Sequence, residues 1–149
     1  MNDADAAAET ETVPLNRTIL LVEDDRDICE IVEQVLAEEN YETIAVANGA
    51  EGLAHLRSPA PRPFVIMLDL MLPVMDAWQF RAEQMRDAAI ADIPVVIFSA
   101  NPKLKKHAYS LGAAAVIRKP PDLDELLSVL GRLVPAPPPE TGSPPTAAE

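Results

Sequence analysis

Hydrophobic residues occur in five short, continuously apolar runs separated by longer amphipathic stretches. The runs are TILLV (18–22), TIAV (43–46), VIML (65–68), VVIF (95–98) and AVI (115–117). Strands that are apolar on both faces are typical of a parallel sheet covered by helices on both sides. The runs therefore predict five buried parallel strands.

The stretches between the runs have the spacing of amphipathic helices. From Ile28 to Leu36, apolar residues recur at i, i+3, i+4, i+7 and i+8, which is one apolar stripe on a charged helix. Residues 48–57 and 78–85 carry weaker patterns, and Trp78 is expected to begin the second of these. The sequence thus predicts a helix after each of the first three strands.

Capping residues predict two further helices. Asn101 followed by Pro102 indicates the start of a fourth helix, which is expected to end at Gly112. Asp122 and Glu125 have the capping-box spacing at the start of a fifth helix. Four leucines of that helix are expected to be buried: Leu123, Leu126, Leu127 and Leu130.

Five alternating strand–helix units predict an α/β fold with right-handed crossovers and one parallel sheet. Five strands fit the doubly wound, flavodoxin-like strand order 2-1-3-4-5. In such sheets ligands bind outside the carboxyl ends of the strands, at the switch point between strands 1 and 3.

Composition divides the chain into three parts. Residues 1–16 and 135–149 are acidic or proline-rich with little to bury, so we expect disordered tails on both sides of a single domain, 17–134. The net charge of -12 argues against direct binding of nucleic acid or an anionic membrane. The absence of a signal peptide and of a membrane-spanning run predicts a cytoplasmic location.

Polar residues follow four of the predicted strands. Glu23 and Asp24 follow the first, Asp69 the third, Ser99 the fourth and Lys119 the fifth. Three clustered carboxylates repel one another unless a cation lies among them, and Mg²⁺, or Mn²⁺, suits such oxygen ligands. The remaining acids of the first loop, Asp25 and Asp27, are interpreted as solvated. A nucleophilic carboxylate, a metal, a hydroxyl and an ammonium are what an acyl-phosphate site needs.

Four segments together resemble the signature segments of response-regulator receiver domains of bacterial two-component signalling. They are ILLVEDDRDI, MLDLMLPVMDAW, VVIFSA and IRKPP, and the resemblance runs from about residue 17 to 134. It implies that Asp69 is the phosphoacceptor and that Asp24, with Glu23 as second acid through water, binds the metal. The backbone carbonyl of Met71 would complete the metal site. Ser99 and Lys119 would contact the phosphoryl group.

The resemblance also implies partners and an activity. Family members accept the phosphoryl group from a sensor histidine kinase, a histidine phosphotransfer protein or a small phosphodonor, so the expected role is a phosphoacceptor signalling protein and not an enzyme. His55 and His107 lie at no position of the site and are interpreted as solvated or packed. Cys29 is expected to be a partly buried, unreactive thiol.

Some residues depart from the family pattern. Val116 stands where the family usually carries an aromatic that swings inward on phosphorylation, and a β-branched valine cannot make that movement. Ala77 replaces the usual glycine, and Ala114 and Ala115 replace residues that are often acidic. These changes leave the residues of the phosphorylation chemistry in place. They put in doubt the usual structural response to phosphorylation, the inward movement of the aromatic.

The expected output is contact with another protein, because only the proline-rich segment follows Val134. The resemblance indicates the face formed by the fourth helix, fifth strand and fifth helix. A basic cluster, Lys103, Lys105, Lys106 and His107, with Tyr109 nearby, offers a surface for an acidic partner or is merely a solvated face. Trp78 caps the core or contacts a partner.

Three hypotheses remain open at this point. The first is a stand-alone switch driven by phosphorylation of Asp69. The second, motivated by Val116, is a pseudo-receiver that binds partners without regulated phosphorylation. The third is an aspartyl-phosphate phosphohydrolase, which typically needs a second carboxylate where this chain has Met71.

Overall fold

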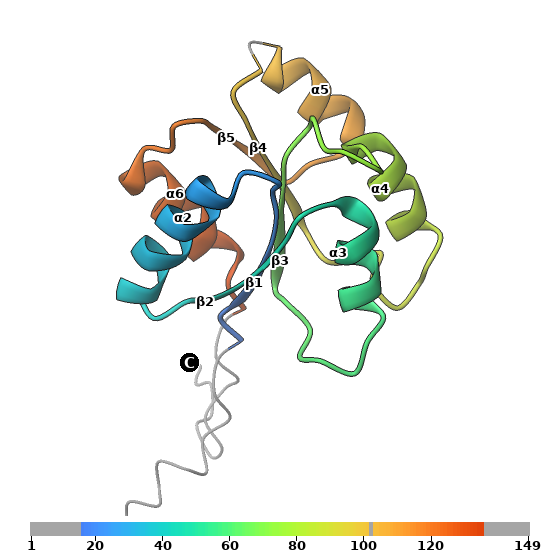
Figure 1. Ribbon diagram of the computed structural model, residues 1–149, viewed down its shortest axis with the longest axis horizontal. Coiled ribbons are helices and arrows are strands. Elements are labelled where there is room, and N and C mark those ends of the chain that lie inside the picture. The colour runs from blue at the N-terminus through green and yellow to red at the C-terminus, as the bar shows by residue number, and fades with distance from the viewer. Residues whose placement is uncertain (1–15, 102, 136–149) are drawn as a thin grey trace, which may run out of the picture.

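The computed structural model describes residues 16–101 and 103–135, which form one parallel sheet with helices on both faces (Figure 1). The strand order is β2-β1-β3-β4-β5, and every pairing is parallel. The predicted α/β class and strand order are confirmed. The strands are β1 (Thr18–Val22), β2 (Glu42–Val46), β3 (Val65–Leu68), β4 (Val95–Ser99) and β5 (Ala115–Arg118), and the helices are α2 (Arg26–Glu38), α3 (Gly49–Leu56), α4 (Ala77–Met85), α5 (Leu104–Leu111) and α6 (Leu123–Leu133).

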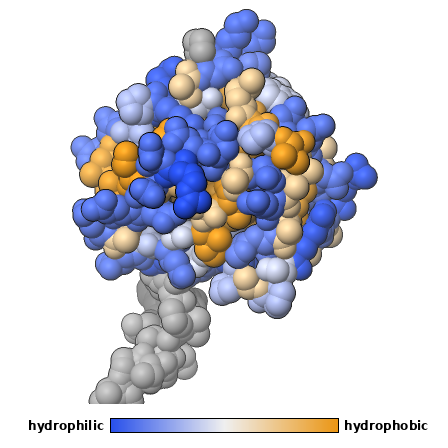
Figure 2. Space-filling view, in the orientation of Figure 1, coloured by the Kyte–Doolittle hydropathy of each residue, from blue (hydrophilic) through white to orange (hydrophobic). Residues whose placement is uncertain are grey.

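The sheet separates two hydrophobic cores. Helices α3, α4 and α5 lie on one face with residues such as Leu20 and Ile97, and α2 and α6 lie on the other with Leu21 and Val96 (Figure 1). Successive strand residues therefore point into different cores, which is why the runs are apolar at every position. The face of the molecule seen in Figure 2 is mostly hydrophilic with separate hydrophobic patches.

Side-chain caps fix where most helices begin. Asp25 accepts hydrogen bonds from the backbone N–H groups of Asp27 and Ile28 at the start of α2, so this exposed acid also caps a helix. Asp122 caps α6 as its spacing predicts. A reciprocal capping box between Asp76 and Gln79 starts α4 at Ala77, one residue before the predicted Trp78.

The predicted start of the fourth helix is wrong. The Asn101 side chain accepts from the N–H of Lys103 and forms a turn, and α5 begins only at Leu104, without a side-chain cap. Pro102 lies outside the described residues. The end at Gly112 is confirmed, because this glycine has φ +69° and terminates α5 in the left-handed conformation.

Two apolar residues of the predicted helix patterns, one of them predicted to be buried, lie at the surface. Leu123 is the first residue of α6 and is 46% exposed because it lines an open groove against α2, while Leu126 and Leu130 are buried. Ile31, part of the predicted stripe, is 59% exposed, and Val32 and Leu36 make the core contacts of α2.

The expected tails, 1–16 and 135–149, lie almost wholly outside the described residues, so the division of the chain remains a prediction. Within 16–101 and 103–135, no helix is long and apolar enough to cross a membrane.

Two residues of α4 test the packing directly. Phe80 is fully buried in the core beside Gly52 of α3, so Phe80→Ala should lower the free energy of unfolding by about 3–5 kcal/mol in urea denaturation. Met85, on the same helix, is 54% exposed, and Met85→Ala should change it by no more than about 0.5 kcal/mol. Equal decreases in the free energy of unfolding for the two variants would contradict this packing.

Candidate functional site

Four strands deliver the predicted site residues to one edge of the sheet. The last residue of β1, Val22, pairs with the last residue of β3, Leu68, so Glu23 and Asp69 come next to each other at the ends of these adjacent strands. The N–H of Asp69 also donates to the Val22 carbonyl. On the other side, the N–H of Lys119 donates to the carbonyl of Ser99. These backbone hydrogen bonds therefore fix the backbone positions from which the side chains of Asp69 and Lys119 extend.

The Lys119 ammonium lies between two buried carboxylates. Its Nζ is 3.0 Å from Oδ2 of Asp69 and 2.5 Å from Oε1 of Glu23, and it lies 5.0 Å from the centroid of the Phe98 ring. Asp69 is 7% exposed and Glu23 only 2%. The long lysine side chain thus passes the Phe98 ring of β4 and joins the end of β5 to the ends of β1 and β3.

The surroundings shift the pKa values of Glu23 and Lys119. Burial raises the pKa of the Glu23 carboxyl, although the Lys119 ammonium and the N–H of Asp25 act in the opposite direction. Burial acts to lower the pKa of Lys119, but its hydrogen bonds to Glu23 and Asp69 more than offset this and leave the pKa raised. Lys119 is therefore a permanent cation at neutral pH.

Three carboxylates have the geometry of a cation site. One oxygen each of Glu23, Asp24 and Asp69 lie within 4.8 Å of one another. Among the described residues, Oε1 of buried Glu23 has no partner except the Lys119 ammonium. Three carboxylates and one ammonium sum to -2, which a divalent cation balances, so the donor set fits Mg²⁺ or Mn²⁺.

Ser99 is the last residue of β4 and is 2% exposed. Its Oγ accepts a hydrogen bond of 3.1 Å from the N–H of Asn101, and its own proton has no acceptor among the described residues. The hydroxyl is thus oriented by the following turn and retains a proton to donate. Sequence reasoning missed this contribution of Asn101, since its place before Pro102 suggested a helix cap instead.

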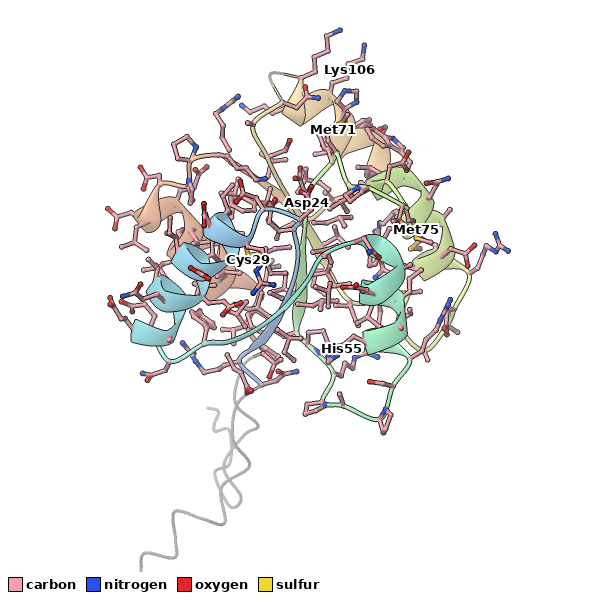
Figure 3. The ribbon with its side chains drawn as sticks, viewed as in Figure 1. Asp24, Cys29, His55, Met71, Met75 and Lys106 are labelled. Atoms are coloured by element: carbon pink, nitrogen blue, oxygen red, sulfur yellow. The ribbon has the colours of Figure 1, made fainter. Side chains whose placement is uncertain are left out.

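Other residues of the sequence analysis lie around this edge or away from it. The N–H of Met71 donates to Oδ1 of Asp69 at 3.3 Å, which places the Met71 backbone beside the carboxylate of Asp69. Figure 3 labels Asp24 and Met71 at the carboxyl edge of the sheet and His55 at the opposite end. His107 lies on α5, and Val116 is partly buried against the core that contains α3, α4 and α5.

Residues 19–131 match the model of the response regulator receiver domain family. The chain is a member of this family. The match runs from the second residue of β1 into the last turn of α6. It includes Glu23, Asp24, Asp69 and Lys119, which we call the carboxylate–lysine cluster.

Individual relatives agree with this assignment. The receiver resembles sporulation initiation phosphotransferase F of Bacillus subtilis, with 30% identity over 81% of this chain and 96% of that protein. It also resembles the phosphorylated cyanobacterial phytochrome response regulator RcpA, with 32% identity, a TM-score of 0.65 and coverage of 77% and 89%. The receiver domain of sensor histidine kinase PA1611 from Pseudomonas aeruginosa, solved with magnesium in its active site cleft, is 25% identical, with a TM-score of 0.71 and coverage of 79% and 97%. The chain spans about half the length of several other curated relatives that it matches.

The thiol of this receiver provides a test of the packing beside Glu23. Cys29 is buried, its Sγ donates to the Glu23 carbonyl, and burial together with the Glu23 charge raises its pKa to about 11. Because only the thiolate reacts, alkylation by iodoacetamide at pH 8 should be about a hundredfold slower than in the unfolded chain and should accelerate as pH rises toward 11.

Mass spectrometry of the folded protein and of the protein in guanidinium chloride measures the two rates. Equal rates at pH 8 would contradict the buried, protonated thiol.

Proposed function

We propose that this receiver takes up a phosphoryl group on Asp69 with a divalent cation held by Asp24, Asp69 and the Met71 carbonyl, with Glu23 acting through water. The observation that carries the proposal is the convergence of Asp69 with Lys119, at 3.0 Å, and with two further carboxylates at one sheet edge. The proposed output is a change in protein–protein contacts.

The electrostatics of the edge support this chemistry. A carboxylate can attack phosphorus only if the repulsion between its charge and that of the phosphoryl oxygens is offset. Lys119 supplies one fixed positive charge beside Asp69. A bound Mg²⁺ supplies further charge neutralisation, and the related receiver of PA1611 was solved with that ion.

The protein groups have separate roles in the transfer. A carboxylate oxygen of Asp69 forms the new bond to phosphorus while the bond to the donor breaks and the donor retains the electron pair. The hydroxyl of Ser99, oriented by Asn101, donates its proton toward a phosphoryl oxygen. The Lys119 ammonium, now held by Glu23 and Asp69, contacts another phosphoryl oxygen. These contacts exist only when the phosphoryl group is present, so they bias the structure.

The proposed donor is a sensor histidine kinase or a histidine phosphotransfer protein. The likeness to a sporulation phosphotransferase and to phosphorylated RcpA supports this class of donor. The face of α5, β5 and α6 is the proposed contact of a downstream protein, and we propose that the receiver acts without a linked effector. The cytoplasmic location stays a prediction.

One observation favours the alternative of a pseudo-receiver. Val116 of β5 is partly buried and packs against the core next to α5. This position of β5 therefore has no aromatic side chain that could move inward. In this alternative the receiver binds its partners equally well in every state of Asp69.

Phosphorylation itself is tested by intact mass after incubation with acetyl phosphate and Mg²⁺. We expect a gain of one phosphoryl group, which chelation of the metal or the substitution Asp69→Asn abolishes. The absence of an adduct would favour the pseudo-receiver. An adduct that survives Asp69→Asn would refute the proposed acceptor.

Neighbouring acids allow a matched test of the metal site. Asp24→Asn removes a proposed ligand and should lower the rate of adduct formation at limiting Mg²⁺ by at least about tenfold, the scale on which even supporting residues of metal sites act. Asp25→Asn keeps the α2 cap, since asparagine caps as well as aspartate, and should change the rate by less than about twofold. Similar rates for both variants would contradict the assignment of Asp24.

A further inference from the structure

Exposed hydrophobic side chains gather on the segment that follows Asp69. Met71 is 68% exposed, Val74 is 79% exposed and Trp78 is 38% exposed. All three lie within ten residues of the proposed acceptor, and none takes part in the carboxylate–lysine cluster through its side chain. Such a concentration of exposed apolar groups on one loop and helix start is typical of an interaction site.

The loop also contains backbone strain. Val74 has φ +70°, a conformation that a β-branched residue rarely adopts. The side chain held in this way faces solvent and makes no core contact that explains it. Strained residues of this kind concentrate at functional surfaces.

Helix α5 places positive charge beside this apolar group. The Trp78 ring packs edge-on against His107 of α5, with 5.1 Å between ring centroids. Three exposed lysines, Lys103, Lys105 and Lys106, precede His107 within about one turn. Figure 3 labels Met71 and Lys106 at the same end of the molecule, near the start of α5. On a chain of net charge -12, this is a local region of opposite sign.

The two helices are joined by a second contact. The guanidinium of Arg81, on α4, donates to the carbonyls of Leu111 and Gly112 at the end of α5 and to the side chain of Gln84. Together with the contact between Trp78 and His107, this holds α4 and α5 in a fixed relation. We call Met71, Val74, Trp78, Lys103, Lys105 and Lys106 the α4–α5 surface.

We propose that the α4–α5 surface binds an acidic amphipathic segment of a partner protein, whose apolar side chains cover Trp78 and Val74 while its carboxylates pair with the lysines of α5. Exposed apolar groups, a tryptophan and an adjoining charge of one sign are the features that recognise such a segment. This deepens the proposed function, on which the coupling to Asp69 rests. The N–H of Met71 donates to Oδ1 of Asp69, so a change at Asp69 acts directly on Met71 of the α4–α5 surface. This coupling does not require an aromatic residue at position 116.

Trp78, the only tryptophan, reports binding directly by its fluorescence. The probe is a short synthetic peptide with leucine and phenylalanine at helical spacing and glutamate elsewhere. Its counterpart has lysine in place of glutamate. We expect the acidic peptide to shift the Trp78 emission to shorter wavelength, in a salt-sensitive manner, and the basic peptide to leave it unchanged. No shift with the acidic peptide, or equal shifts with both, would overturn the proposal.

Variants locate the binding site with a fluorescein-labelled acidic peptide. The charge reversal Lys105→Glu with Lys106→Glu, and separately Trp78→Ala, should each weaken binding by about tenfold or more. The matched control Ile31→Ala with Leu123→Ala removes exposed apolar groups between α2 and α6 and should leave the affinity unchanged. Circular dichroism verifies that each variant is folded. Unchanged affinity in the α5 and Trp78 variants, or loss in the control, would overturn the proposal.

Other occupants give different results. Self-association of the free protein that the Lys105 and Lys106 reversal abolishes would identify a second copy. Tighter peptide binding after deletion of residues 1–15, which carry four acids, would identify the chain's own N-terminal segment. Either result would overturn a separate partner.

Beryllofluoride with Mg²⁺ tests the coupling, and we expect it to change the peptide affinity by at least about fivefold. Acetyl phosphate adduct formation is measured on the same variants. Normal adduct formation without peptide binding would refute only this inference, and peptide binding without any adduct would refute only the proposed function.

Discussion

The site depends on one contact, the Lys119 ammonium between the carboxylates of Glu23 and Asp69. Two buried carboxylates at adjacent strand ends would repel each other strongly in a poorly solvated position. The lysine offsets this repulsion from β5, two strands away from β3, by extending over the Phe98 ring. The strand order therefore has a direct chemical consequence, because only a sheet with β3, β4 and β5 side by side brings this cation to the acids.

The sequence predicted those parts of the molecule that depend on local pattern. Four of the five apolar runs are followed by a polar residue, so these strand ends and the convergence of Asp69, Ser99 and Lys119 followed from the run boundaries and the strand order. Features that depend on tertiary packing were not predictable. Leu123 has the helical spacing of a core residue but lines an open groove between α6 and α2. Asn101 resembles a helix cap, yet its backbone orients Ser99.

The departures from the family pattern lie outside the carboxylates and the lysine of the acidic edge. Val116 has no aromatic ring to move, but Asp69 remains linked to the segment after β3 through the N–H of Met71. That segment leads into α4, and α4 is joined to α5 through Arg81. A change of charge at Asp69 thus has a short route to both helices that avoids β5.

The most direct test of this account is to locate the phosphoryl group after reaction with acetyl phosphate and Mg²⁺. Borohydride reduction converts an acyl phosphate into a stable product, and peptide mass mapping then identifies the modified residue. We predict modification of Asp69 alone, with none on Glu23 or Asp24, because Asp69 contacts Lys119 and follows β3, the strand that pairs with β4 and its last residue, Ser99. Modification of another carboxylate, or of none, would contradict the account.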